Sequence, residues 1–132
     1  MISTVLATNI RRHSLRMVHR ARASHIGSAL SIADIVGVLY GGILKFDPRN
    51  PADPNRDRFI LSKGHACVAV YAALAETGFI ETELLHTYGD EGAALMNHIS
   101  HRVPGVEFSS GSLGHGLPFG AGKALAGKRS GQ

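Results

Sequence analysis

Histidines in predicted turns and loops are the residues of this chain whose chemistry is easiest to define. The chain has 132 residues and eight histidines, and His25, His65, His98, His101 and His115 stand in such segments, mostly beside glycine or serine. Imidazole is well suited to move protons near neutral pH and to hydrogen-bond sugar hydroxyls or phosphates. A zinc site is the competing interpretation, but only His98 and His101 are compactly spaced, with no further cysteine or carboxylate pair nearby in sequence.

Glycines concentrate in the second half of the chain, most densely over residues 111–116. Such a segment lets backbone N–H groups approach a ligand, and a helix beginning just afterwards favours an anion at its N-terminus. The spacing matches neither the dinucleotide fingerprint nor the P-loop, because Phe119 stands where a third glycine belongs and Ala124 follows Gly122-Lys123. A ligand-binding loop and a plain flexible loop are both compatible with this spacing.

The turn Lys63-Gly64-His65 is a second candidate for ligand binding. It follows an apolar run over residues 58–62, which predicts a buried strand, and it precedes a helix predicted from Ala66. The carboxyl end of a parallel strand that opens into a helix is the usual ligand-facing edge of an open α/β sheet. An ordinary turn that carries a surface lysine and histidine is the alternative.

Composition limits the remaining classes of protein. Hydrophobic residues make up 44% of the chain, and 14 Lys and Arg against 10 Asp and Glu give a net charge of +4, as expected for a globular chain of one domain or part of one. A single cysteine, Cys67, excludes an internal disulfide framework and suits a reducing compartment, and the short apolar runs indicate no membrane span. Five arginines precede the first acidic residue, Asp34, a composition typical of a transit peptide or of a helix that faces nucleic acid or another anion.

The periodicity of apolar residues predicts a mainly helical chain. We expect helices over residues 3–22, 31–44, 66–76, 82–88 and 118–127. The proline-rich segment 47–55 predicts a loop, and residues 58–62 and 106–108 predict a good strand and a brief one. A single good strand cannot pair its own backbone edges, so either the protein is mainly helical or its other strands lie on sequence outside this chain.

Four short segments occur in an order that is typical of one enzyme family. They are Ser24-His25-Ile26-Gly27-Ser28, Asp57-Arg58-Phe59-Ile60-Leu61-Ser62-Lys63-Gly64-His65, His98 ahead of Val103-Pro104-Gly105-Val106, and Ser110-Gly111-Ser112-Leu113-Gly114-His115-Gly116. Together they resemble the N-terminal, pyrophosphate-binding region of transketolases, most closely the bacterial form that is split into two subunits. The resemblance covers nearly the whole chain from about Asn9, and four motifs in the right order and spacing make it specific.

The resemblance implies an α/β thiamine-diphosphate-binding fold, of which residues 1–132 would form an incomplete, helix-rich N-terminal portion with few strands. It implies transfer of a two-carbon ketol unit from a ketose phosphate to an aldose phosphate, with thiamine diphosphate and Mg²⁺ as cofactors. His25 and His98 would bind the substrate and serve catalysis, and His65 would touch the cofactor diphosphate. Gly111, Ser112 and Leu113 would line the cofactor's ring system.

The resemblance also sets expectations about what this chain lacks. Ile26 stands where proline is common, and His115 stands where glutamine is frequent, which fits the split type. The family's Gly-Asp-Gly metal motif would follow Gln132, so no residue here matches a metal ligand, and the pyrimidine-binding domain is also absent. We therefore expect a truncated chain or an N-terminal subunit that is inactive alone, binds cofactor weakly and tends to associate through exposed apolar surface.

The expected partners are sugar phosphates, further copies of this chain and a C-terminal transketolase subunit, in the cytoplasm, without nucleic acid or membrane. Two alternatives remain open from the sequence. The first is a non-enzymatic module whose basic helix binds RNA or an acidic partner. The second is a related thiamine-diphosphate enzyme, such as a deoxyxylulose-phosphate synthase.

Overall fold

Apolar residues three or four positions apart build the first helix, α1 (Ser3–Ala21), of the computed structural model, which describes residues 2–131. Leu6, Ile10 and Met17 form an apolar stripe along one face of α1, and the small polar Ser14 lies among them. All four residues are buried. The helix ends at Arg22, whose φ of 49° is the left-handed conformation that commonly terminates helices. The predicted helix over residues 3–22 is therefore confirmed.

The helix predicted over residues 31–44 is wrong in its extent, because the chain forms two short pieces there and a third just before them. They are α2 (Ile26–Leu30), α3 (Ala33–Val38) and the wide π-helical turn η1 (Leu39–Ile43). Ile32 leaves helical geometry between α2 and α3, and in η1 the Leu44 N–H donates to the Leu39 carbonyl at 2.9 Å. Close packing places α3 against α1, since a Cβ on Gly37 would lie 2.9 Å from the Cβ of Ala7.

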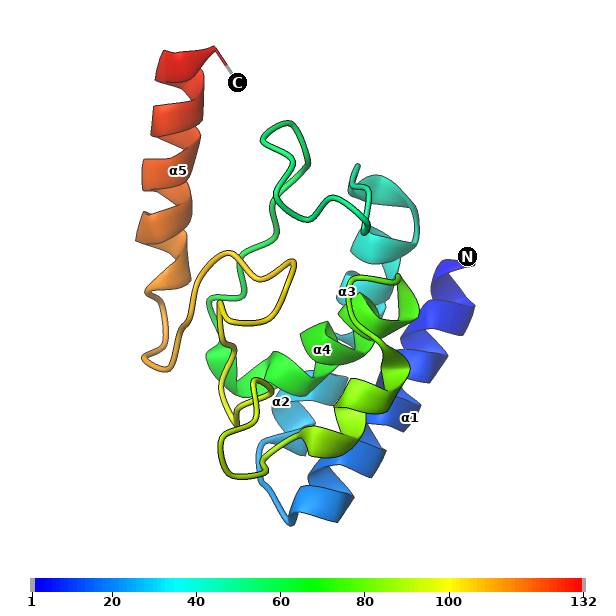
Figure 1. The fold of residues 1–132 in the computed structure, drawn as a ribbon. Helices are drawn as coiled ribbons and strands as arrows, with labels where there is room; N and C mark the ends of the chain where they lie inside the picture. The colour runs from blue at the N-terminus through cyan, green and yellow to red at the C-terminus, as the bar shows by residue number, and fades with distance from the viewer. Residues whose placement is uncertain (1, 132) are drawn as a thin grey trace.

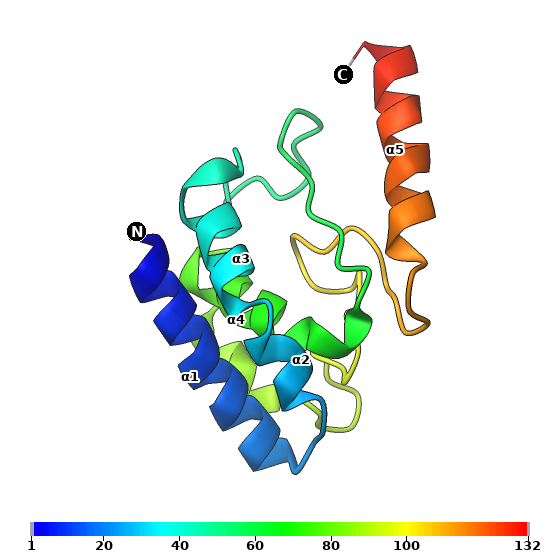
Figure 2. The same ribbon diagram turned by 180° about the vertical axis from the view of Figure 1, so that it is seen from behind.

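Helix α4 (Cys67–Glu76) lies at the centre of the body, with α1 and α3 packed against it (Figures 1 and 2). Every residue from Cys67 to Ala75 is buried, and many of them are alanines that allow close approach. The 3₁₀ turns η2 (Gly64–Ala66) and η3 (Thr82–Thr87) lie before and after α4 in the chain. The helices predicted over residues 66–76 and 82–88 are thus confirmed, the second as a 3₁₀ segment.

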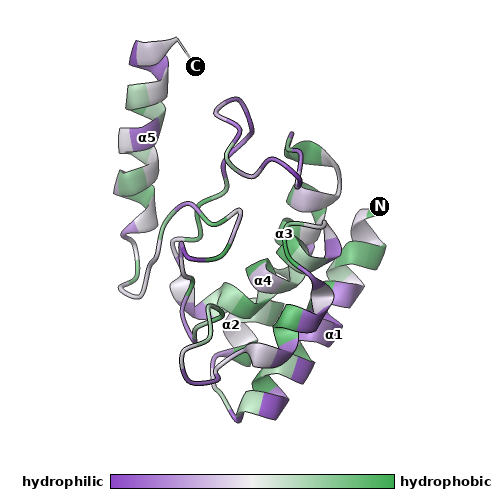
Figure 3. Cartoon of the chain, in the orientation of Figure 1, coloured by the Kyte–Doolittle hydropathy of each residue, from purple (hydrophilic) through white to green (hydrophobic). Residues whose placement is uncertain are grey.

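Hydropathy follows this arrangement. Figure 3 shows hydrophilic and hydrophobic turns interleaved along α1, whereas α4 is hydrophobic or neutral along its length. Within residues 2–131, no helix combines the length and the apolar character that crossing a membrane requires.

Both predicted strands are wrong. Within residues 2–131 the β-structure consists of one isolated antiparallel bridge, between Ile99 and Ser110. Leu61 in the segment 58–62 is buried, as an apolar residue of a strand would be. No neighbouring segment within residues 2–131 pairs with this backbone in a β-ladder. Side chains take the place of strand pairing, since the Ser110 hydroxyl donates to the Leu61 carbonyl at 2.8 Å.

Helix α5 (Gly116–Ser130) stands away from the rest of the molecule in both ribbon views (Figures 1 and 2). It begins and ends outside the predicted range of 118–127, because the glycines of this segment remain helical until Gly131 adopts a φ of 79° and stops the helix. Stacking of the Phe108 and Phe119 rings, with centroids 4.3 Å apart, holds its first turns to the body. An ion pair of 3.0 Å between Lys123 and Glu107 adds a second attachment.

Candidate active site

Three imidazole rings from distant parts of the chain meet in one cluster. His25 precedes α2, His65 lies in η2, and His98 lies in the loop after η3. The ring centroids of His65 and His98 are 4.6 Å apart, those of His25 and His65 are 4.7 Å apart, and those of His25 and His98 are 5.7 Å apart. No two of the rings lie parallel, so each presents its nitrogens in a different direction.

A backbone junction beneath the cluster fixes the distance between His65 and His98. The Gly64 carbonyl accepts the Ile99 N–H at 3.1 Å, and Ile99 also forms the bridge with Ser110. Gly64 itself lies so close to Ser110 that an added Cβ would fall 1.8 Å from the Ser110 carbonyl oxygen. Only glycine permits this approach, which brings the turn before α4 into contact with the glycine-rich segment.

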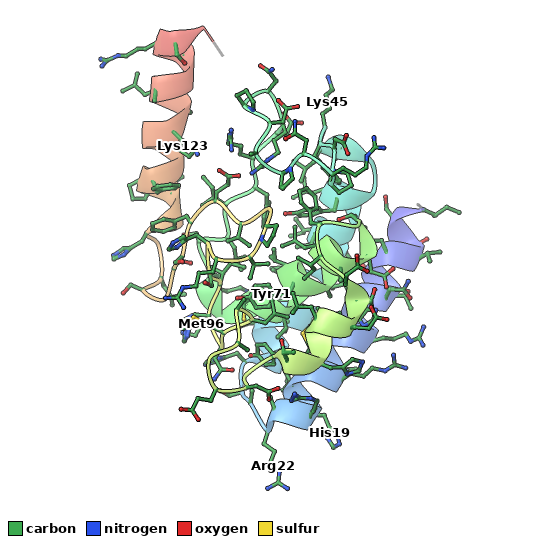
Figure 4. All side chains as sticks on the ribbon, viewed as in Figure 1. His19, Arg22, Lys45, Tyr71, Met96 and Lys123 are labelled. Atoms are coloured by element: carbon green, nitrogen blue, oxygen red, sulfur yellow. The ribbon has the colours of Figure 1, made fainter. Side chains whose placement is uncertain are left out.

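Further hydrogen bonds anchor the same segments to the core. The Tyr71 hydroxyl of α4 donates to the His98 carbonyl at 3.0 Å, and the Gly116 N–H donates to the Ser62 hydroxyl at 3.1 Å. Figure 4 shows Tyr71 near the middle of the body. Tyr71 lies outside the four motifs, and Ser110 begins the fourth motif but was given no role in the site. The glycine in Lys63-Gly64-His65 was the sequence signal for the close approach.

His25 is held in an unusual backbone conformation. Its φ of 74° is left-handed, a region in which histidine is enriched among the residues other than glycine but which remains uncommon. The side chain is exposed, beside a cavity of about 410 Å³ that His98 also lines. The geometry therefore turns His25 toward solvent and toward any molecule that occupies this cavity, while His65 and His98 are half-buried.

The electrostatics of the cluster favour the neutral form of His98. Burial lowers the pKa of His98, and the neighbouring charges that His65 and His25 would carry lower it further. A neutral imidazole can donate from one ring nitrogen and accept at the other. Nδ1 of His65 is buried and has no hydrogen-bond partner among residues 2–131, which leaves one polar atom of the cluster without a partner.

The glycine-rich segment reaches the cluster at one end. A Cβ placed on Gly111 would lie 3.9 Å from Cδ2 of His98 and would meet no other atom within 4 Å. The backbone at Gly111 therefore runs beside His98 and leaves space next to it. Ser112 and Leu113, which follow in the chain, are exposed. The unpartnered His65 nitrogen and the open backbone at Gly111 fit a flat, polar cofactor that carries a diphosphate.

Metal ligation is not provided by the residues that the structure describes. Within residues 2–131, no three His, Cys, Asp or Glu side chains are placed to hold a metal ion together. His101, which shares a compact spacing with His98, instead contacts Ser109, with its Nδ1 2.7 Å from the hydroxyl oxygen. The residues present therefore do not fit a magnesium site.

Comparison with known proteins identifies the family. The family model described as "Transketolase, thiamine diphosphate binding domain" matches residues 2–131. The chain belongs to the transketolase family. This membership favours the transketolase interpretation over the non-enzymatic basic module.

Individual relatives agree with the family match. The chain is 42% identical over 118 residues to one subunit of the apulose-4-phosphate transketolase of Phocaeicola vulgatus, a match that covers 89% of this chain and 42% of that protein. It is 41% identical over 121 residues to the SqwG subunit of the 6-deoxy-6-sulfo-D-fructose transketolase of a Clostridium species, covering 91% of this chain and 44% of the relative. The chain thus spans less than half the length of these two transketolase subunits.

A solved structure shows the same architecture. The transketolase from Campylobacter jejuni superimposes with a TM-score of 0.91 at 35% identity, covering 98% of this chain and 20% of that chain. The fold described above is therefore a helix-rich portion of the thiamine-diphosphate-binding fold of transketolases.

Proposed function

We propose that this chain supplies part of the cofactor and substrate site of an enzyme that transfers a two-carbon ketol unit from a ketose phosphate to an aldose phosphate. Membership in the transketolase family supports the reaction class. The observation that carries the proposal is the meeting of His25, His65 and His98 within 5.7 Å of one another, because acid–base chemistry on hydroxyl groups needs donors and acceptors that converge on one small volume. The related deoxyxylulose-phosphate chemistry is the alternative within the same cofactor class.

Each imidazole has a role that suits its surroundings. His25, exposed beside the cavity, would bind substrate hydroxyls and move their protons. His98, whose lowered pKa keeps it neutral, would hydrogen-bond the reacting end of the substrate and accept or return a proton there. When bound, thiamine diphosphate supplies the electron sink that stabilises the carbanion.

The cofactor would be held by His65 and the glycine-rich segment. Nδ1 of His65 is the unpartnered buried atom and would hydrogen-bond the diphosphate. The backbone at Gly111 would pack against the cofactor ring, with Ser112 and Leu113 extending the same wall. Within residues 2–131 no cluster of metal ligands is present, so these four residues would contact the organic cofactor alone.

We also propose that a second, pyrimidine-binding subunit completes the site and that the assembly contains several copies of each chain. The two relatives described above are named as transketolase subunits, which supports this arrangement. Sugar phosphates are the proposed substrates. A reducing, cytoplasmic setting suits a chain whose single cysteine is a buried free thiol.

The test is ketol transfer by the full chain assembled with its completing subunit, thiamine diphosphate and Mg²⁺. His25→Gln and His98→Gln should each lower kcat by about a hundredfold or more, because a positioned general acid or base contributes that much. His101→Gln is the matched control, since this histidine is exposed and bonds Ser109 instead of joining the cluster. Equal rates for all three variants would refute the proposed roles, and absence of ketol transfer by the assembled wild type would refute the reaction class.

A further inference from the structure

A second group of basic side chains surrounds a cavity that the proposed reaction does not use. The cavity has a volume of about 300 Å³ and lies between α1 and η3, and none of its lining residues belongs to the imidazole cluster. Its floor is apolar, since Met17 and Leu85 line it and are only 3% and 5% exposed. Its other lining side chains are basic apart from Thr82; they are His13, Arg16, His19, Arg20 and His86. Figure 4 places His19 near the C-terminal end of α1.

Two of these basic groups are already neutralised by acids. The side chain of His13 is only 17% exposed, and its Nε2 contacts the Glu76 carboxylate at 2.8 Å. Arg20 makes two hydrogen bonds to Asp90, at 3.0 and 2.6 Å. The carboxylates of Glu76 and Asp90 are therefore committed to these partners.

The remaining basic groups are uncompensated. Among residues 2–131, Arg16, His19 and His86 form no ion pair and no side-chain hydrogen bond, and α1 contains no acidic residue along its whole length. Basic residues in the last turn of a helix stabilise the helix dipole, which accounts for His19, but Arg16 lies before that turn. An unpaired guanidinium beside an apolar floor is suited to a ligand that joins negative charge to a nonpolar part.

We propose that this cavity binds a small organic phosphate ester. The guanidinium of Arg16 would donate hydrogen bonds to the phosphate oxygens, and the rings of His19 and His86 would donate further ones. The organic part of the ligand would pack against Met17 and Leu85. A volume of about 300 Å³ is at the lower end of known small-molecule pockets, which limits the ligand to a small one. The site is separate from the imidazole cluster, so it would bind an effector or a second anion and not the reacting sugar.

The test uses the full chain and phenyl phosphate, a probe with one ring and one phosphate, followed by the backbone amide signals in ¹H–¹⁵N NMR spectra. We expect saturable shifts at residues 16–20 and 82–86, with a Kd on the order of 1 mM for a ligand of this size. Arg16→Gln should weaken this binding about tenfold or more, because it removes a charge-assisted pair of hydrogen bonds.

Arg12→Gln is the matched control, because Arg12 is exposed on the same helix, does not line the cavity and carries the same charge. It should change the Kd less than about twofold, and inorganic phosphate should bind several times more weakly than phenyl phosphate, since it cannot use the apolar floor.

Several outcomes would overturn the proposal. Equal weakening by the two substitutions would mean that net charge alone attracts the anion. Inorganic phosphate binding as tightly as phenyl phosphate would exclude a role for the apolar floor. Shifts confined to residues 24–26 and 64–66 would place the anion at the imidazole cluster. Tighter binding of a single-stranded RNA, reduced equally by both substitutions, would indicate a nucleic-acid surface instead.

Discussion

Replacing Gly64 by alanine tests the backbone junction on which the imidazole cluster depends. The new Cβ would lie 1.8 Å from the Ser110 carbonyl oxygen and 2.7 Å from the carbonyl carbon, neither of which is the end of a flexible side chain. The first separation must grow by about 1.6 Å to reach the 3.4 Å of ordinary contact. Because the Gly64 carbonyl also accepts the Ile99 N–H, this movement strains the connection between the His65 and His98 segments.

We expect Gly64→Ala to lower the free energy of unfolding by about 2–3 kcal/mol, the upper part of the range for overpacking a well-packed interior. A displacement of this size should also lower the rate of ketol transfer about a hundredfold, if the reaction needs His65 and His98 at their present separation. Urea unfolding of the full chain, followed by circular dichroism, measures the first effect, and ketol transfer by the assembled enzyme measures the second.

Gly122→Ala is the control for this experiment. Nothing lies within 4 Å of a Cβ at Gly122, which is exposed on α5, so the same substitution there should stabilise the helix by up to about 1 kcal/mol. A Gly64→Ala variant with an unchanged urea midpoint would show that Gly64 and Ser110 do not approach as described, and the account of how the cluster is positioned would fail.

Three further predictions follow from buried titratable groups. Glu107→Gln should lower the free energy of unfolding by about 3 kcal/mol, because it leaves Arg56, 7% exposed, without its carboxylate. Burial raises the pKa of Glu107, but hydrogen bonds from its cationic partners lower it more, so this stability is present at neutral pH and is lost as the pH falls through the lowered value; urea midpoints between pH 7 and 3 measure it. His98 should titrate below the ordinary pKa of about 6.5 in NMR spectra, and His65→Gln should raise that pKa by removing a neighbouring charge; an unchanged value would contradict the described cluster. Burial raises the pKa of the Cys67 thiol to about 12, so iodoacetamide at pH 8 should modify it only as the chain unfolds, and rapid modification of the folded chain would contradict its burial.

The parts of the fold that the sequence predicted are those in which local pattern and packing agree. The stripe of Leu6, Ile10 and Met17 predicted α1 because the helix must bury that face. The alanine-rich run predicted α4, and its small side chains are buried at the centre of the body. The resemblance to transketolases predicted that His25, His65 and His98 belong to one site. The rings do lie together, while the chemical roles of these residues stay predictions.

The failures occur where structure depends on a partner segment. The apolar run over residues 58–62 satisfies the pattern of a buried strand. A strand also needs a neighbouring strand to pair with, and the number of apolar residues in the run does not show whether such a neighbour exists. The contact between Gly64 and Ser110 spans 46 positions of the chain and left no periodic signal. The pairing of His13 with Glu76 likewise depends on the packing of α4 against α1, which no local sequence pattern reveals.

The two groups of histidines in this chain differ in their packing, and we propose acid–base chemistry for one group and anion binding for the other. In the cluster of His25, His65 and His98, burial lowers the pKa of His98 and the charges that the two neighbouring rings would carry lower it further, so the neutral form of His98 is favoured there. Neutral rings suit hydroxyl groups and proton transfer. Around the second cavity the rings of His19 and His86 are exposed beside the unpaired guanidinium of Arg16, whose charge is permanent. Under the two proposals, histidines that pack against one another would transfer protons, whereas histidines exposed beside an arginine would bind an anion.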